Sequence, residues 1–271
     1  MEKNTKTRLN KIISHNTKYS RREADELIKN GDVTIDGKVV SDLSTKVDFK
    51  DKVRIKGRRL YKKDHFSVIV YHKQKGELVT KKDDRGRKTV FDSLPKQFAH
   101  YLPVGRLDFA SEGLILLTDS PSVATTLMQS DLERVYYLKI KGNITPAMEE
   151  GMKSGVFIDS KVGGHKDSHI ESMQIKPFLA YKIIKNSPTF SKLKVAISEG
   201  QNRELRRFFA YFDSEVTDLK RVSFAGVDLG VLKPGKNRYL SKSEYQSLHD
   251  FIHQKKGMIQ QYLKTKTNND S

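Results

Sequence analysis

The spacing of apolar residues changes along the chain and divides it into three segments. Short apolar groups between charged residues occupy positions 1–64, longer patterns fill 65–253, and a polar stretch makes up 254–271. We expect a small module with its linker, then a main domain. The last segment is expected to begin as a helix and end as a polar tail without regular structure.

The first segment predicts two short helices followed by a hairpin. Leu9, Ile12 and Ile13 recur at helical spacing, and Ser20 begins a capping box whose glutamate lies three residues later. In the stretch DVTIDGKVV, apolar and polar residues alternate, and the Asp-Gly pair at 36–37 predicts a two-residue turn between strands.

The main segment mixes strand and helix patterns without a repeated strand–helix–strand order. FSVIVY is an apolar run typical of a buried strand, and VYYLKIKG and KLKVAIS alternate as half-buried strands do. NRELRRFFAYF predicts a helix with Leu205, Phe208, Phe209 and Phe212 on one face. Together they predict an α+β fold with a largely antiparallel sheet. Residues 155–192 are less regular and predict an insertion or a long hairpin.

The net charge of the chain indicates which class of partner it binds. The chain has 51 Lys and Arg against 33 Asp and Glu, a net charge of +18, and residues 1–64 alone carry +8. Such an excess predicts a polyanionic partner, either nucleic acid or an anionic membrane surface. No apolar run is long enough to cross a bilayer, and there is no cysteine for a disulfide. We expect a soluble protein of the cytoplasm.

One stretch, VGRLDFASEGLILLTD at 104–119, places an acid in an unusual setting. Asp108 follows an arginine-bearing turn and precedes the apolar run Leu114-Ile115-Leu116-Leu117. A carboxylate close to a buried strand is costly to keep charged unless a cation pairs with it. Asp108 is therefore either half of a structural ion pair or an active-site acid, base or nucleophile. The residues alone leave both interpretations open.

The first segment also resembles a known RNA-binding module. RLNKIISHNTKYSRREADELIKNGDVTIDGK is similar to the αL module that a small-subunit ribosomal protein shares with several RNA-modifying enzymes. The resemblance implies that the basic faces of the two helices contact phosphates, and clustered Lys and Arg release counterions from an RNA backbone. The implied RNA-binding residues are Arg8, Lys11, Lys18, Arg21, Arg22 and Lys29. The alternative is a solvated basic helix face.

Four motifs of the main segment resemble the pseudouridine synthases of the RsuA type. GRLDFASEGLILLTD is similar to their signature, KGELVTKKDDRGRKTVFDSLP to the segment before it, and SEGQNRELRRFF to their E-G-x-N-R-x-x-R-R motif. LKRVSFAGVDLGVLKPGKNRYL is similar to their closing pattern. The motifs follow in the family's order behind the αL module, so the resemblance covers most of residues 7–245.

The resemblance implies isomerisation of uridine within RNA, a reaction that requires no cofactor and no metal. Asp108 matches the catalytic aspartate, acting as nucleophile on the sugar or as the base that removes a ribose proton. Arg206 stands where the family places the arginine paired with that aspartate. Tyr136 matches the tyrosine that stacks on the target base, and the neighbouring Tyr137 is the competing choice because it points to the opposite strand face.

Further roles follow from the same resemblance. Arg106 would fill the gap left by the flipped uridine, and Leu205 would line the pocket. Arg203 and Arg207 are expected to contact phosphates. Glu112, four residues after Asp108, suggests a glycosidase pair, but a turn and strand do not bring residues at that spacing together.

Two departures from the family pattern concern RNA preference. Gln74 stands where the family has a proline before its signature, and DLERVYYL lacks the usual basic approach to the tyrosine. The expected substrate is ribosomal RNA, with a plan closer to the large-subunit enzymes, and the expected enzyme is a monomer with no membrane partner. The alternatives are an RNA-binding ribosome-assembly factor without catalysis and an enzyme acting on tRNA. Turnover distinguishes the first alternative, since a binding protein shifts RNA without changing a base.

Two other patterns are weaker. The stretch GVLKPGKN at 230–237 approaches a nucleotide-binding loop but ends in Asn where Ser or Thr is needed, so we interpret it as a turn. His165 and His169 have the spacing of a helical metal pair, but the sequence around them is not helical and offers no third ligand.

Overall fold

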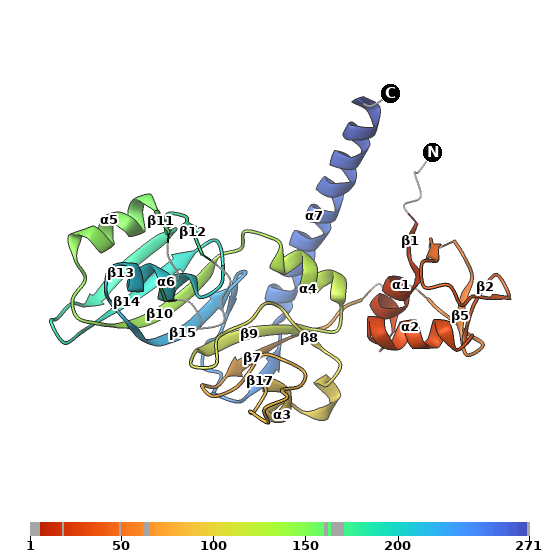
Figure 1. The fold of residues 1–271 in the computed structure, drawn as a ribbon, viewed down its shortest axis with the longest axis horizontal. Helices are drawn as coiled ribbons and strands as arrows, with labels where there is room; N and C mark the ends of the chain where they lie inside the picture. Colours follow the sequence, from red (N-terminus) through yellow and green to blue (C-terminus); the bar gives the residue numbers. More distant parts are fainter. Residues whose placement is uncertain are drawn as a thin grey trace. The chain divides into compact units, whose positions relative to one another are not determined.

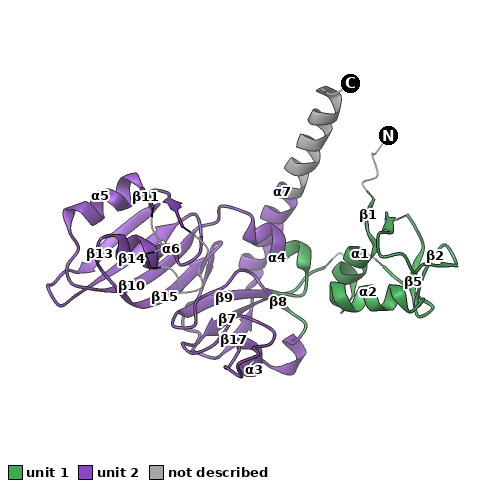
Figure 2. Ribbon diagram, in the orientation of Figure 1, with its two compact units in different colours: residues 1–67, 100–102, 118–124 green, residues 68–99, 103–117, 125–271 purple. Residues whose placement is uncertain are grey.

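The computed structural model describes residues 6–17, 19–48, 50–61, 65–159, 162–163 and 171–269, with side chains as far as Lys255. The chain forms two compact units (Figure 2). Unit 1 is residues 1–67 with 100–102 and 118–124, and unit 2 is residues 68–99, 103–117 and 125–271. The domain limits predicted at 64 and 253 stay predictions. Lys18, His165 and His169 lie outside the described residues.

In unit 1, two helices and short strands enclose a small apolar core. Helix α1 (Leu9–Asn16) and helix α2 (Arg21–Lys29) bury Leu9, Ile13 and Ile28 completely. The capping box of α2 is present in full, since the Ser20 side chain accepts from the Glu23 N–H and the Glu23 carboxylate accepts from the Ser20 N–H. Both helices therefore begin and pack where the apolar spacing predicts.

The strands of unit 1 form two small sheets. Asp36 and Gly37 both have positive φ, 50° and 85°, which is the conformation of the predicted two-residue turn. That turn joins β2 to β3, and β2 also pairs with β5. The strands are β1 (Thr7–Arg8) with β4 (Lys46–Val47), and β3 (Lys38–Val39), β2 (Val33–Ile35), β5 (Val53–Ile55) and β6 (Arg58–Arg59) in that order.

Unit 2 is built on a nine-stranded sheet, shown in Figure 1. Its order is β13-β14-β10-β15-β9-β7-β17, with β16 on β15 and β8 on β9. Every pairing with a printed register is antiparallel except β15 with β9, so the predicted α+β class with a largely antiparallel sheet is confirmed. The strands are β7 (Val68–Lys73), β8 (Leu102–Pro103), β9 (Glu112–Thr118), β10 (Arg134–Lys141), β13 (Ala180–Lys185), β14 (Phe190–Ile197), β15 (Val216–Phe224), β16 (Val227–Asp228) and β17 (Asn237–Tyr239).

Helices and a strand pair cover one face of this sheet. Helix α6 (Glu204–Tyr211) turns Leu205, Phe208 and Phe209 into the core of the unit, as its apolar spacing predicts, with Phe212 packed beside them. The strands of this face contribute residues such as Leu138 and Leu193 to the same core. The other elements there are α5 (Pro146–Ser154), β11 (Val156–Ile158) and β12 (Met173–Ile175).

The irregular stretch 155–192 contains two antiparallel strand pairs, β11 with β12 and β13 with β14. Helix α7 (Lys242–Asn269) includes the helix expected at the start of 254–271, and it continues as far as residue 269, where a polar tail without regular structure was expected. Within the described residues, no helix combines the length and the apolar character needed to cross a membrane. The remaining helices are α3 (Val90–Ser93), the 3-10 helix η1 (Lys96–Phe98) and α4 (Pro121–Met128).

Candidate active site

Asp108 lies on a tight turn at the head of a fully buried strand. The Ser111 N–H donates to the Asp108 carbonyl oxygen at 3.0 Å, which closes the turn, and β9 follows at once with Leu114 through Leu117 at 0% exposure. Leu107, the residue before Asp108, is buried in the core of unit 2. The turn is therefore anchored on both sides, and the carboxylate between its anchors is about one-third exposed.

A glycine allows the start of β9 to approach its parallel neighbour. Gly113 has φ +115°, and a Cβ added there would lie 2.2 Å from the Arg221 carbonyl oxygen of β15. No side chain fits at that distance, and the backbone conformation is one that L-residues rarely adopt. Gly113 thus fixes β9 against β15 five residues after Asp108.

Two arginines hold the Asp108 carboxylate, Arg206 of α6 and Arg203, which precedes that helix as its N-cap residue. The Arg206 Nε lies 3.2 Å from Oδ2, and the Arg203 Nη1 lies 3.1 Å from the same oxygen. Arg206 also donates from Nη1 to the Val216 carbonyl at 2.7 Å and from Nη2 to the Ser111 hydroxyl at 3.3 Å. Because three nitrogens of Arg206 have separate acceptors, its guanidinium plane is fixed and so is the direction of its bond to Asp108.

Burial of Arg206 is the cost of this arrangement. Its side chain is 13% exposed, and desolvation lowers its pKa from the usual value, while the charge of Asp108 acts in the opposite direction. An arginine stays protonated despite such a shift. The site therefore keeps a permanent cation within hydrogen-bond distance of a partly exposed carboxylate.

Tyr136 and Leu205 occupy the same core cluster as Leu107. All three are at most 9% exposed, and the cluster includes residues of β10 and α6 on the face of the sheet that bears Arg206. Tyr137 points to the opposite face and is 44% exposed. The geometry therefore favours Tyr136 over Tyr137 as a wall of the Asp108 site, while its contact with a base stays a prediction.

The comparisons with known proteins agree with this geometry. The sequence pattern of the RNA pseudouridylate synthase family matches residues 67–211, which include Asp108 and Arg206. A Helicobacter pylori protein described as an uncharacterized RNA pseudouridine synthase is 47% identical over 248 residues, 90% of this chain and 94% of its own length. The chain belongs to the RNA pseudouridylate synthase family.

Other members of the family, and a second sequence pattern, extend the match. The S4 domain pattern matches residues 7–53, the segment predicted as the αL RNA-binding module. The ribosomal large subunit pseudouridine synthase B of Bacillus subtilis is 32% identical over 243 residues, 89% of this chain and 95% of its own. A crystal structure of a pseudouridylate synthase has the same fold over 89% of this chain and 99% of its own, with TM-score 0.60 and 23% identity. The resemblance inferred from the motifs is confirmed.

Two arginines lie elsewhere than the sequence predicts. Arg203, expected at a phosphate, donates instead to Asp108 and, from Nε, to the Gly163 carbonyl at 2.8 Å. Its φ of +52° is rare for a residue with a side chain and turns it toward the carboxylate. Arg207 is 0% exposed, which argues against the phosphate contact predicted there, and that contact stays a prediction. Arg106 is exposed on the turn, as base flipping requires.

Sequence reasoning missed Lys73, which supports the Asp108 turn from within the fold. Lys73 ends β7 at 0% exposure, and its Nζ donates to the Ser111 carbonyl at 2.7 Å and the Gln74 carbonyl at 2.9 Å. Desolvation lowers the pKa of Lys73 to about 8, although Glu77, Asp108 and Glu112 oppose the shift. A lysine at the end of an apolar run was the signal that would have found it.

Glu112 already has two basic side chains as partners of its own. Its carboxylate lies 2.9 Å from the Lys220 Nζ and 3.3 Å from the His72 Nε2. Burial acts to raise the pKa of Glu112, but Lys220 and His72 together lower it below the usual value. Glu112 is therefore an ionised member of a structural group, which agrees with setting aside a glycosidase pair.

The helices of unit 1 expose the cations that the module resemblance implies. Arg8, Lys11, Arg21, Arg22 and Lys29 are all exposed, and Lys29 is bonded to Glu26 at 3.2 Å. Between Lys11 and Arg21 lies the half-buried His15. Burial, followed by the charges of Lys11 and Arg21, lowers the pKa of His15 to about 4. A positive potential therefore exists at this helix pair, and RNA contact there stays a prediction.

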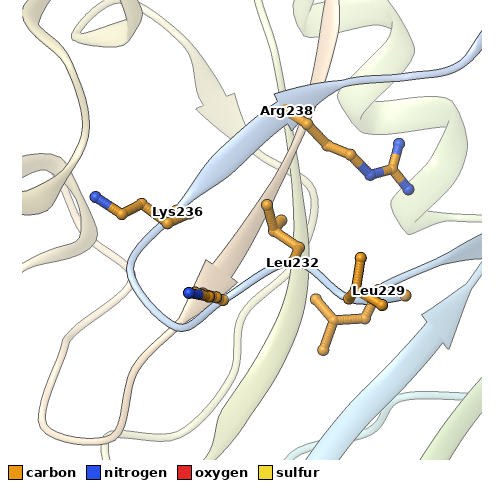
Figure 3. A pocket seen from close by; sticks show the side chains of 7 residues that line it. Leu229, Leu232, Lys236 and Arg238 are labelled. Atoms are coloured by element: carbon orange, nitrogen blue, oxygen red, sulfur yellow. The ribbon is translucent and has the colours of Figure 1, made fainter.

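A hollow of about 470 Å³ lies apart from these residues, at the turn between β16 and β17. Leu229, Leu232, Lys236 and Arg238 are among its lining residues (Figure 3). The stretch 230–237 forms turns with Gly230 and Gly235 at positive φ and leads into a strand. A nucleotide-binding loop leads into a helix, so the interpretation of this stretch as a turn is confirmed.

Proposed function

We propose that this chain isomerises uridine to pseudouridine in large-subunit ribosomal RNA. The observation that carries the proposal is the Asp108 carboxylate, partly exposed and bonded to both Arg203 and Arg206 on one oxygen. The Bacillus subtilis relative bears the name of a large-subunit ribosomal enzyme, and the S4 domain match and the charge of +18 suit a structured RNA substrate.

The reaction needs a carboxylate at the ribose, and Asp108 supplies it. The C1′–N1 bond of the nucleotide breaks, the uracil rotates, and a bond forms between C5 and C1′. The proton on C5 leaves and N1 gains one, so the atoms of product and substrate are the same. Asp108 acts either as nucleophile at the sugar or as the base that takes a ribose proton. Both roles use the carboxylate as an anion, and the Arg206 guanidinium lies 3.2 Å from it.

The neighbouring residues hold the base and the RNA. Tyr136 stacks on the detached uracil, Leu205 forms the adjoining wall, and Arg106 enters the space that the flipped nucleotide leaves. These roles rest on the family resemblance and on the placement of Tyr136 and Leu205 in one core cluster. The exposed cations of α1 and α2 bind phosphates of the same RNA.

We further propose that the enzyme acts as a monomer in the cytoplasm, where ribosomal RNA is assembled. Asp108, Arg203, Arg206 and Tyr136 all come from one chain, and no second copy is needed to complete the site.

The test is a pseudouridine map of total rRNA and tRNA from cells that lack the protein. The cells are complemented with the wild type or with Asp108→Asn. We expect one large-subunit rRNA position to lose pseudouridine and only the wild type to restore it. Loss of pseudouridine at a tRNA position instead would mean that the substrate is tRNA and not rRNA. An unchanged map would favour the non-catalytic assembly factor.

A further inference from the structure

The face of the central sheet turned away from α6 carries a dense set of lysines. Along β10, Tyr136, Leu138 and Ile140 enter the core, so the alternating residues point the other way. The same alternation applies to β13, β14 and β15. We call this outer surface the lysine face, and its basic members are Lys139, Lys182, Lys185, Lys192, Lys194 and Lys220.

The strand register aligns these side chains in two rows across four strands. The order in each row is β13, β14, β10, β15, and each residue is the direct partner of the next. The first row is Lys182, Lys194, Tyr137 and Lys220, and the second is Lys185, Lys192, Lys139 and Asp218. Neighbouring strands lie about 4.8 Å apart, so one row extends over about 14 Å.

Like charges at directly opposite positions destabilise a sheet. In the described part of the chain, most of the lysines in these two rows have no acidic partner to offset that repulsion. Among the described residues, Lys139, Lys182, Lys192 and Lys194 form no ion pair within 4 Å. The one acid in the two rows, Asp218, is bonded to Lys75 at 2.8 Å. Lys220, at the end of the first row, is paired with Glu112 at 2.9 Å. The other lysines named here lie side by side without such an acid, and this part of the face is suited to a polyanion.

Aromatic rings are interleaved with these lysines. Tyr137 is 44% exposed, and the Lys194 Nζ lies 5.9 Å from its ring centre. The ring of the half-buried Phe190 forms cation–π contacts, with its centre 4.4 Å from the Lys139 Nζ and 4.2 Å from the Lys185 Nζ. A hollow of about 700 Å³ opens on the face, with Tyr137, Lys194 and Lys220 on its wall. Two carboxylates, Glu133 and Asp228, also line it, so the cations lie on only part of the wall. Rings that offer a stacking surface beside cations are the arrangement that binds single-stranded nucleic acid.

We propose that the lysine face is a second RNA-binding surface, which takes a single-stranded segment of the substrate RNA. Its lysines contact phosphates, and Tyr137 stacks on a base in the hollow. The proposal rests on the proposed function for the identity of the polymer. Because Tyr136 and Tyr137 point to opposite faces, the strand that carries the base-stacking residue of the active site also carries this second contact.

The first experiment removes two charges from the face and two from elsewhere in the full-length protein. Lys192→Gln with Lys194→Gln changes adjacent rows, and Lys233→Gln with Lys236→Gln is the matched control at exposed positions of the β16–β17 turn. Affinity is measured over a range of salt with two probes, an oligouridylate and a large-subunit rRNA transcript. We expect about tenfold weaker binding and a salt slope lower by about 1.4, while the control stays close to wild type.

A stability measurement separates a binding role from a structural one. Removing like charges that face each other relieves repulsion, so Lys192→Gln with Lys194→Gln is expected to unfold at the same temperature as the wild type or a higher one. Tyr137→Leu, which keeps an apolar side chain without the ring, is expected to weaken oligouridylate binding at least about fivefold.

The outcomes distinguish this proposal from the proposed function. If the wild type isomerises uridine and the face variant binds RNA like the control variant, the lysine face is overturned and the function stands. If the wild type makes no pseudouridine but the face variant loses RNA affinity, the face stands and the function fails. Binding to phosphatidylglycerol vesicles that the face variant abolishes, with RNA affinity unchanged, would overturn the RNA assignment in favour of a membrane surface.

Discussion

The cations of unit 1 and those at Asp108 have the same charge in opposite surroundings. On α1 and α2, Lys11, Arg21 and Arg22 are exposed. At Asp108, Arg206 is 13% exposed, and three of its nitrogens are bonded to separate acceptors. Exposed cations supply affinity that depends on salt and little on geometry, whereas an enclosed arginine fixes the direction of one carboxylate. Binding and chemistry should therefore respond to different substitutions.

The largest difference between the effect on turnover and the effect on RNA binding is expected at Asp108. Asp108→Asn keeps the shape of the side chain and removes the charge that the transition state uses, so turnover should fall below about one-thousandth of the wild-type rate. RNA affinity should stay within about twofold, because a carboxylate contributes nothing favourable to phosphate binding. Single-turnover pseudouridine formation and a binding titration on the same RNA measure both. A loss of affinity as large as the loss of rate would contradict the assignment.

The two arginines at Asp108 should differ from each other. Arg206→Lys keeps the charge but cannot donate to Asp108, Val216 and Ser111 together, so the rate at saturating RNA should fall about 100-fold. Arg203→Lys should lower the rate about tenfold, since Arg203 donates to two acceptors, Asp108 and Gly163, where Arg206 donates to three. Circular dichroism checks the fold of each variant. A larger loss from Arg203→Lys would reverse their ranking.

The module should respond in the opposite way. Arg21→Ala with Arg22→Ala should weaken RNA binding about tenfold and lower the salt slope by about 1.4, with the rate at saturating RNA unchanged. Lys38→Ala with Lys52→Ala, at exposed positions outside the helices of the same unit, is the control for net charge. An unchanged slope in the helix variant would remove α2 from the RNA contact.

The smallest expected effect is a titration in the module. The pKa of His15, about 4 when folded, lies below its usual 6.5, so the unfolded chain binds the proton more readily. Stability should therefore fall as the pH drops from about 6.5 to 4, by about 1 kcal/mol after allowance for solvent screening. His15→Gln should flatten this dependence in urea unfolding. RNA phosphates near Lys11 and Arg21 should raise the His15 pKa, which NMR titration detects.

Local signals predicted much of the fold. The capping box at Ser20 and the turn at 36–37 depend on residues a few positions apart, so the sequence contains all the interacting groups. The apolar face of α6 was also visible, since helical spacing brings Leu205, Phe208 and Phe209 together. The pairing of Asp108 with Arg206 came from the family resemblance alone, because nothing local relates residues 98 positions apart.

The errors concern side chains whose surroundings come from distant segments. Arg203 is the N-cap residue of α6 and Arg207 lies within that helix, and spacing alone did not say which of them faces the carboxylate. The positive φ of Arg203 and the close approach of Gly163 to the backbone of residues 206–207 decide it. Lys73 was missed for a similar reason, because its acceptors lie on the turn at 109–111.

The distance along the sequence between Asp108 and its arginines also determines the order in which the two parts of the protein can fold during synthesis. The partners of the carboxylate are 95 and 98 residues further along the chain, and β15 must then lie against Gly113. The core of α1 and α2, by contrast, closes among residues 9–55. Because a growing chain can fold only what has left the ribosome, the module is complete while the catalytic pairing has not yet been synthesised. On the proposed function, unit 1 of a nascent chain can bind RNA before the catalytic site around Asp108 has formed.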